Sequence, residues 1–128
     1  MTGHRPGRPA PDGRAGPALV AAVATAAEAD QAIASGADLI DGSGLTRQDL
    51  AALRARHPGL RLWHGAPAAT DADHAGTPAA AVATAAVRAW LGPAAIRTRH
   101  VLPVRRAIDM TSSIAGTRLP ALTTRGLA

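Results

Sequence analysis

Short apolar runs alternate with helix-like segments along most of this chain, and this alternation restricts the possible fold more than any other feature. The apolar runs occupy residues 18–24, 37–41, 60–64 and 94–98. Segments with helical spacing or helix-end signals occupy residues 25–35, 47–57, 78–91 and about 103–116. Strands that alternate with helices usually pair in parallel, so the sequence predicts an α/β fold.

Helix-end residues mark where two of these helical segments begin. Thr46, with Asp49 three residues later, has the spacing of a capping box before segment 47–57. Thr77 followed by Pro78 is typical of a helix start, because proline at the first helical position loses no hydrogen bond. We expect segment 78–91 to pack inward through Ala83, Ala86, Val87, Trp90 and Leu91.

The length of the chain limits the kind of parallel sheet that it can form. A complete eight-stranded (β/α) barrel usually needs about 200 residues or more, and this chain has 128. The sequence therefore predicts a partial (β/α) barrel of TIM type, or a small open sheet, with about four parallel strands. We divide the chain into a Pro/Gly-rich leader (1–17) that we expect to be disordered, an α/β domain (18–116) and a C-terminal tail (117–128).

Composition bears on the partners and on the compartment. Aromatic residues make up 2% of the chain and alanine dominates its apolar residues, so the core is built of small side chains and a homo-oligomer is plausible. All 14 basic residues are arginine, spread without interleaved aromatics, which argues against nucleic-acid binding. The chain has no cysteine, which fits the reducing cytoplasm. It also has no apolar run of about 18 residues, so we expect no membrane span.

Candidate binding residues follow the last apolar run. In parallel α/β folds, ligands bind at the carboxyl ends of the strands. Alternation along a strand puts Arg97 and Arg99 on the same side, and two guanidinium groups there suit a phosphate or pyrophosphate. The alternative is that these arginines are solvated or pair with Asp41 or Asp109.

A second group of polar side chains is a candidate metal site. Its members are His64, Asp71, Asp73 and His74, with His100 as a further candidate. Two imidazoles and two carboxylates have the right chemistry for a divalent ion. Their spacing matches no metal-binding helix, and Asp-Ala-Asp-His in a Gly/Pro-rich loop is ordinary turn composition. We therefore assign no metal ligands.

Residues 92–101 (GPAAIRTRHV) resemble the last strand of the dihydropteroate synthases, the (β/α)8-barrel enzymes of folate synthesis. Residues 117–128 resemble the C-terminus of an actinobacterial-type branch of that family. The resemblance implies that Arg97, Arg99 and His100 bind the pyrophosphate of a pterin substrate. Arg97 stands at the family's arginine, whereas Arg99 stands at its histidine and His100 at its acidic position.

Residues 36–45 (GADLIDGSGL) also resemble a strand of the same family, one residue shorter. The family's Asn-Asp pair contacts the pterin ring there, so the resemblance implies that Asp41 is a pterin-binding residue. The alternative is a strand followed by an ordinary helix-capping turn.

Several parts of the family's catalytic apparatus have no counterpart in this chain. The Asn-x-Thr-Pro-Asp-Ser-Phe loop and the Asp-Pro-Gly strand are missing, and the chain has no lysine. We therefore assign no catalytic residue and expect a degenerate, non-catalytic protein that binds pterin pyrophosphate or another small anion. The alternatives are an active synthase that needs Mg²⁺ and works only as an assembled homo-oligomer, an interaction partner of a full-length synthase, and a remnant without a function of its own.

Overall fold

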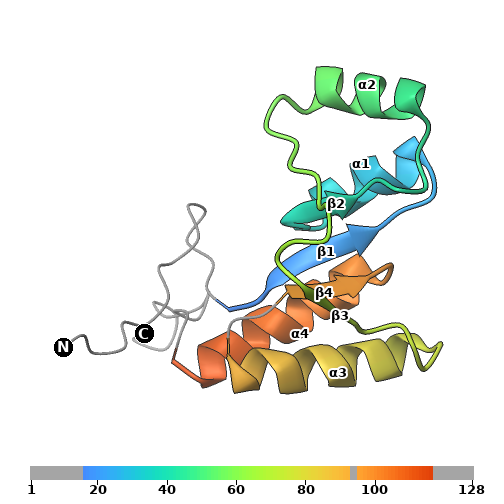
Figure 1. The fold of residues 1–128 in the computed structure, drawn as a ribbon. Helices are drawn as coiled ribbons and strands as arrows, with labels where there is room; N and C mark the ends of the chain where they lie inside the picture. Colours follow the sequence, from blue (N-terminus) through green and yellow to red (C-terminus); the bar gives the residue numbers. More distant parts are fainter. Residues whose placement is uncertain (1–15, 93–94, 117–128) are drawn as a thin grey trace.

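The computed structural model of the chain describes residues 16–92 and 95–116, where four strands alternate with four helices (Figure 1). The strands are β1 (Ala18–Ala22), β2 (Leu39–Asp41), β3 (Ala69–Asp71) and β4 (Ala95–Thr98). The helices are α1 (Ala26–Ala34), α2 (Arg47–Arg56), α3 (Pro78–Leu91) and α4 (Val101–Ile114). The predicted leader lies outside the described residues except for Gly16 and Pro17, and the predicted tail 117–128 lies wholly outside them.

These four strands form one sheet in the order β2-β1-β4-β3, and every neighbouring pair is parallel. Strand β1 lies in the interior of the sheet, with Val20 opposite Leu39 of β2 on one side and Arg97 of β4 on the other. The parallel sheet with alternating helices confirms the predicted α/β class.

The prediction of a third strand over residues 60–64 is wrong. In that segment Leu62 makes a single parallel bridge to Ile40 at the edge of β2. The sheet takes its fourth strand from β3 instead, which lies in a segment that the sequence predicted to be a loop. Periodicity identifies extended backbone, but the partner edge of a strand is decided by contacts far away in the sequence.

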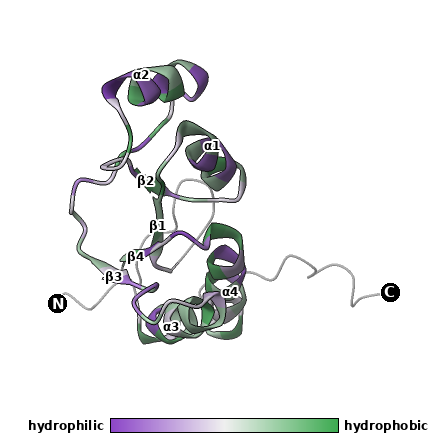
Figure 2. Ribbon diagram, turned by 90° about the vertical axis from the view of Figure 1, so that its right-hand side faces the viewer, coloured by the Kyte–Doolittle hydropathy of each residue, from purple (hydrophilic) through white to green (hydrophobic). Residues whose placement is uncertain are grey.

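The helices cover one face of the sheet. Three connections that contain a helix step one strand in the same direction: from β1 to β2 through α1, from β2 to the bridge at Leu62 through α2, and from β3 to β4 through α3. Because such crossovers are right-handed, steps in one direction place their helices on one face. Figure 2 shows α1 and α4 on one side of the sheet and the chain between α2 and β3 on the other.

Each face of the sheet has its own apolar cluster. The helix-covered face carries the larger cluster, which includes Leu19, Ile40, Leu53, Ile96, Val104 and Ile108. On the opposite face Val20, Leu39 and Ala95 are buried, and Trp63 packs against them. The segment that leads from α2 to β3 thus covers a face that no described helix covers.

Helix α3 packs through its smallest side chains. Ala81, Ala85 and Ala89 are buried, whereas the predicted inward residues Val87, Trp90 and Leu91 are 58%, 61% and 70% exposed. The predicted inward face of this helix is therefore wrong. Alanines four residues apart line one side of a helix, and they let α3 lie close to its neighbours.

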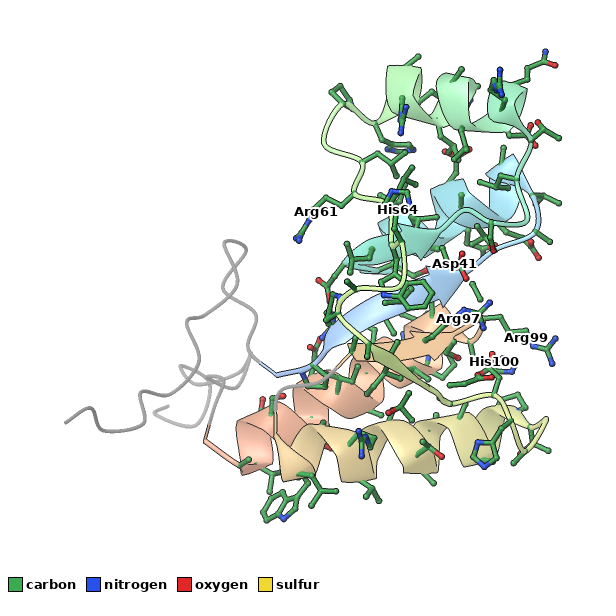
Figure 3. All side chains as sticks on the ribbon, viewed as in Figure 1. Asp41, Arg61, His64, Arg97, Arg99 and His100 are labelled. Carbon is green, nitrogen blue, oxygen red and sulfur yellow. The ribbon has the colours of Figure 1, made fainter. Side chains whose placement is uncertain are left out.

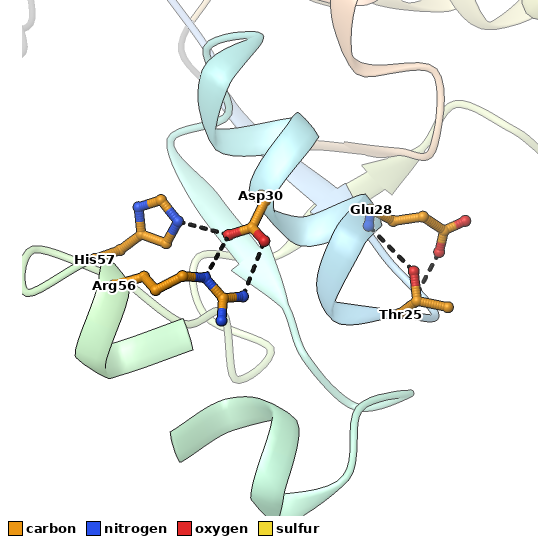
Figure 4. Close-up of polar contacts among 5 residues, drawn as sticks. All are labelled: Thr25, Glu28, Asp30, Arg56 and His57. Atoms are coloured by element: carbon orange, nitrogen blue, oxygen red, sulfur yellow. Dashed lines mark hydrogen bonds and ion pairs between the residues drawn. The ribbon is translucent and has the colours of Figure 1, made fainter. Parts of the chain in front are cut away.

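Polar contacts fix the start of α1 and join α1 to α2 (Figure 4). Thr25 and Glu28 form a capping box, in which the Thr25 hydroxyl accepts from the Glu28 N–H and the Glu28 carboxylate accepts from the Thr25 N–H. Asp30 of α1 accepts hydrogen bonds from Arg56 at 2.9 Å and contacts the His57 imidazole at 2.7 Å. The His57 and Arg56 hydrogen bonds hold the pKa of the Asp30 carboxyl below its usual value.

Candidate functional site

The carboxyl ends of the four described strands border a groove of about 460 Å³. Its charged lining consists of Glu28, Asp41, Asp71, Asp73, Arg97 and Arg99. This is the edge at which parallel α/β sheets bind their ligands. The structure therefore brings three of the four predicted binding residues, Asp41, Arg97 and Arg99, to one groove (Figure 3).

Asp41 and Arg97 form an ion pair within this groove. The Arg97 Nε donates to Asp41 Oδ2 at 2.8 Å, and the Ser43 N–H donates to Asp41 Oδ1 at 3.1 Å. Burial by itself raises the pKa of the Asp41 carboxyl, but the hydrogen bonds from Arg97 and Ser43 outweigh it, and the pKa lies below its usual value. The structure therefore contains the ion pair between Arg97 and Asp41 that the sequence analysis offered as an alternative.

Strand β1 separates the strands that carry these two residues. Its residue opposite Asp41 is Ala22, and this methyl group leaves room for the Arg97 side chain to reach across. The turn after Asp41 also approaches β1 closely, because a Cβ on Gly44 would lie 3.0 Å from the Val23 carbonyl oxygen.

Asp73 anchors the turn between β4 and α4. Its carboxylate accepts from the Thr98 hydroxyl at 2.6 Å and from the Arg99 N–H at 2.8 Å. The Arg99 guanidinium lies 3.9 Å from the same carboxylate and is 62% exposed. From the sequence, Asp73 was a candidate only as a metal ligand. No local pattern predicts its contact with Thr98, which lies 25 positions later in the chain.

His100 lies apart from the groove. It lines a separate hollow of about 390 Å³ with Arg99, between α1 and the first turn of α4. The backbone N–H of His100 donates to the Thr98 hydroxyl at 2.9 Å. The three residues predicted to bind one anion therefore line two adjoining hollows. Arg97 lines the groove, His100 lines the separate hollow, and Arg99 lines both.

The candidate metal ligands named from the sequence do not form one cluster among the described residues. Within residues 16–92 and 95–116, no three histidine or acidic side chains stand together as metal ligands do. Asp71 instead accepts the Asp73 N–H at 2.9 Å, in an ordinary turn. The part of the chain that the structure describes thus supplies no ready three-ligand site for Mg²⁺.

Asp41 also lines a second hollow, of about 390 Å³, on the side of β2. The other side chains that line this hollow belong to Ser43, Leu50, Leu62, Trp63 and His64. No local pattern associates Trp63 with Asp41, because the two line one hollow only where the chain returns along the edge of β2.

Protonation of Asp41 is expected to reduce stability at acidic pH. The pKa of this carboxyl is lower in the folded protein than in the unfolded chain, where it is about 3.9. Its stabilising contribution is therefore complete above that value and is lost as the pH falls through the folded-state pKa. In urea titrations between about pH 6 and pH 2, we expect the difference between the wild type and Asp41→Asn to shrink with decreasing pH. A constant difference would contradict this pairing.

Comparisons with known proteins found no similar protein. The chain matched no protein-family model, no curated protein and no solved structure. Among the described residues, no helix has the length and apolar character needed to cross a membrane.

Proposed function

We propose that this protein is a non-catalytic relative of the dihydropteroate synthases that binds a pterin pyrophosphate, or a similar small organic anion, in the strand-end groove. The observation that carries the proposal is the meeting of Asp41, Arg97 and Arg99 at that groove. A carboxylate accepts ring N–H groups, and guanidinium groups donate to phosphate oxygens. These are the roles that the resemblance implies for the same three residues.

The strand order supports a partial TIM barrel as the framework of this site. Strand β1 pairs with β4, so the first and last described strands are neighbours, as they are in a closed barrel. Buried residues of all four described helices join one apolar cluster with one face of the sheet, which matches the outer ring of a barrel, whereas a doubly wound sheet carries helices on both faces. In a barrel of this type the carboxyl end is the binding end.

We assign binding without catalysis because the groups needed for the chemistry are missing. The chain has no lysine and lacks the family's metal- and pyrophosphate-binding loop. The described residues form no three-ligand metal site, so Mg²⁺ enters the proposal only if synthase activity is retained. A cytoplasmic location fits a folate-related ligand and a chain without cysteine.

The alternatives stay as predictions: a synthase assembled from two or more copies, and an interaction partner of a full-length synthase. We prefer the binding function because Asp41, Arg97 and Arg99 meet at one groove within a single copy.

Loss of Arg97 is expected to abolish most of the anion binding. Calorimetric titration with 6-hydroxymethyl-7,8-dihydropterin pyrophosphate, with and without Mg²⁺, should show heat of binding for the wild type. Arg97→Ala should weaken this binding about 10- to 100-fold, because a hydrogen bond to a charged group contributes about 1.5–3 kcal/mol.

The matched control for this titration is Arg106→Ala. Arg106 is an exposed residue of α4, so this variant loses the same charge outside the groove and should bind like the wild type. Equal weakening in both variants would indicate a general effect of charge. No heat from a wild-type sample shown to be folded by circular dichroism would refute the proposed function.

A further inference from the structure

The outer side of α3 is apolar from its first residue to its last. All exposed residues of this helix are apolar: Pro78, Ala79, Ala83, Val87, Trp90 and Leu91. Its single charged residue, Arg88, is partly buried. A helix that faces solvent normally carries polar residues on that side, and a helix that is apolar all round is normally buried. The exposed side of α2, by comparison, carries Arg47, Arg54 and Arg56. The outer side of α3 therefore has the composition of a covered surface.

More apolar side chains are exposed on the neighbouring helix. Helices α3 and α4 lie side by side with their C-terminal ends at the same end of the sheet (Figure 1). Val87, Trp90 and Leu91 of α3 and Met110 and Ile114 of α4 are between 58% and 71% exposed. At about 200 Å² for an aromatic side chain and about 100 Å² for an aliphatic one, these five expose about 400 Å². One side of a protein–protein interface usually buries about 800 Å², of which about 57% is apolar, so the available area suits a dimer.

Side-chain size changes along the outer side of α3. Its first half exposes the small residues Ala79 and Ala83, whereas its second half exposes Val87, Trp90 and Leu91. When a second copy of α3 lies antiparallel to the first across a two-fold axis, the large half of each copy faces the small half of the other. Large residues opposite small ones fill space without voids, and an uncharged surface brings no like charges together. The outer side of α3 is therefore complementary to itself.

We infer that a second copy of this chain covers the outer side of α3, in a two-fold homodimer whose α3 helices pack antiparallel. The dimer is independent of the proposed function, because no residue of α3 lines the strand-end groove. It also differs from the assembled synthase, in which the copies would join through their sheets to complete one barrel. In the α3 dimer each copy keeps its own groove.

The dimer should be weak, because its area lies near the lower end of the range of about 1,200–2,000 Å² that specific interfaces bury in total. We expect a dissociation constant of about 10–100 µM. By mass action the chain is then mostly monomeric at about 1 µM and mostly dimeric at about 500 µM. Urea unfolding at about 1 µM therefore reports on the monomer, in which Leu91 is an exposed residue.

Sedimentation equilibrium of the full chain, between about 1 and 500 µM, tests the dimer. The mass of the wild type should rise from 12.9 kDa toward twice that value. Trp90→Ala should weaken the association about 10- to 100-fold, because tryptophan is among the residues that contribute most to interfaces. Val87→Glu should stay monomeric, because two-fold symmetry puts two like charges in one contact. Both residues are exposed, so both variants should keep the fold, which circular dichroism checks.

The matched control is Ala51→Glu, which adds the same negative charge to the exposed side of α2 and should dimerise like the wild type. A wild type that stays monomeric at the highest concentration would overturn the inference; this result is expected if residues 117–128 or a different protein cover α3. Dimerisation that Val87→Glu leaves unchanged, or that Ala51→Glu abolishes equally, would also overturn it. These results leave the proposed anion binding standing, because the calorimetric titration tests that function separately.

Discussion

Arg105→Ala should lower the free energy of unfolding by about 3–5 kcal/mol, because removing one partner of a buried ion pair is strongly destabilising. The Arg105 guanidinium on α4 lies 3.1 Å from Asp38 and 3.0 Å from Asp109, and its side chain is 5% exposed. It also donates to the Gly36 carbonyl oxygen at 3.3 Å. Asp38 in turn accepts the Leu19 N–H at 2.8 Å, so the loss reaches the backbone of β1.

Urea unfolding followed by circular dichroism measures this effect. The control is Arg106→Ala, the next residue on the same helix, which is exposed and should change stability by no more than about 0.5 kcal/mol. A total stability of about 5–15 kcal/mol is usual for a domain, so the Arg105 variant should unfold at a much lower urea concentration. Similar midpoints for the two variants would show that the Arg105 contacts contribute little.

Leu53→Ala should cost about 2–5 kcal/mol, the usual range for deleting a fully buried leucine side chain. Leu53 is the one buried residue of α2 and is 0% exposed. The other contacts that hold α2 against α1 include the partly exposed pairs of Asp30 with Arg56 and His57, and pairs of that kind contribute little. We therefore expect α2 to lose its attachment before the rest of the domain unfolds.

Amide hydrogen exchange locates this loss. Amides of α2 should exchange faster in Leu53→Ala, whereas amides of β1 and β4 should keep most of their protection. Leu91→Ala makes the same chemical change at a residue that is 70% exposed, and its stability should stay within about 0.5 kcal/mol of the wild type. Faster exchange spread evenly over the sheet would argue that α2 and the sheet unfold as one unit.

Local chemistry determined most helix positions. The predicted segment 78–91 coincides with α3, and segment 47–57 differs from α2 by one residue. Thr46 and Thr77 both accept the backbone N–H three residues later. Such caps depend on neighbours within one turn, so they can be read from the sequence.

Nonlocal packing decided the features that were predicted wrongly. Residues 60–64 alternate as a strand does, yet they make only the bridge at Leu62, and β3 pairs with β4 in their place. Helix α3 buries Ala85 and exposes Trp90, because its position beside α4 favours small side chains. Neither the edge that a strand joins nor the face that a helix buries is written in local periodicity alone.

The candidate site shows the same division. By itself the sequence determined that Asp41, Arg97 and Arg99 stand at strand ends, because apolar runs and the polar residues that follow them are local patterns. Only the tertiary structure decided that Arg97 reaches Asp41, that His100 lines a separate hollow and that Trp63 and Asp41 line the same hollow. The reason is the strand order β2-β1-β4, which joins residues 56 positions apart through contacts that no stretch of sequence contains.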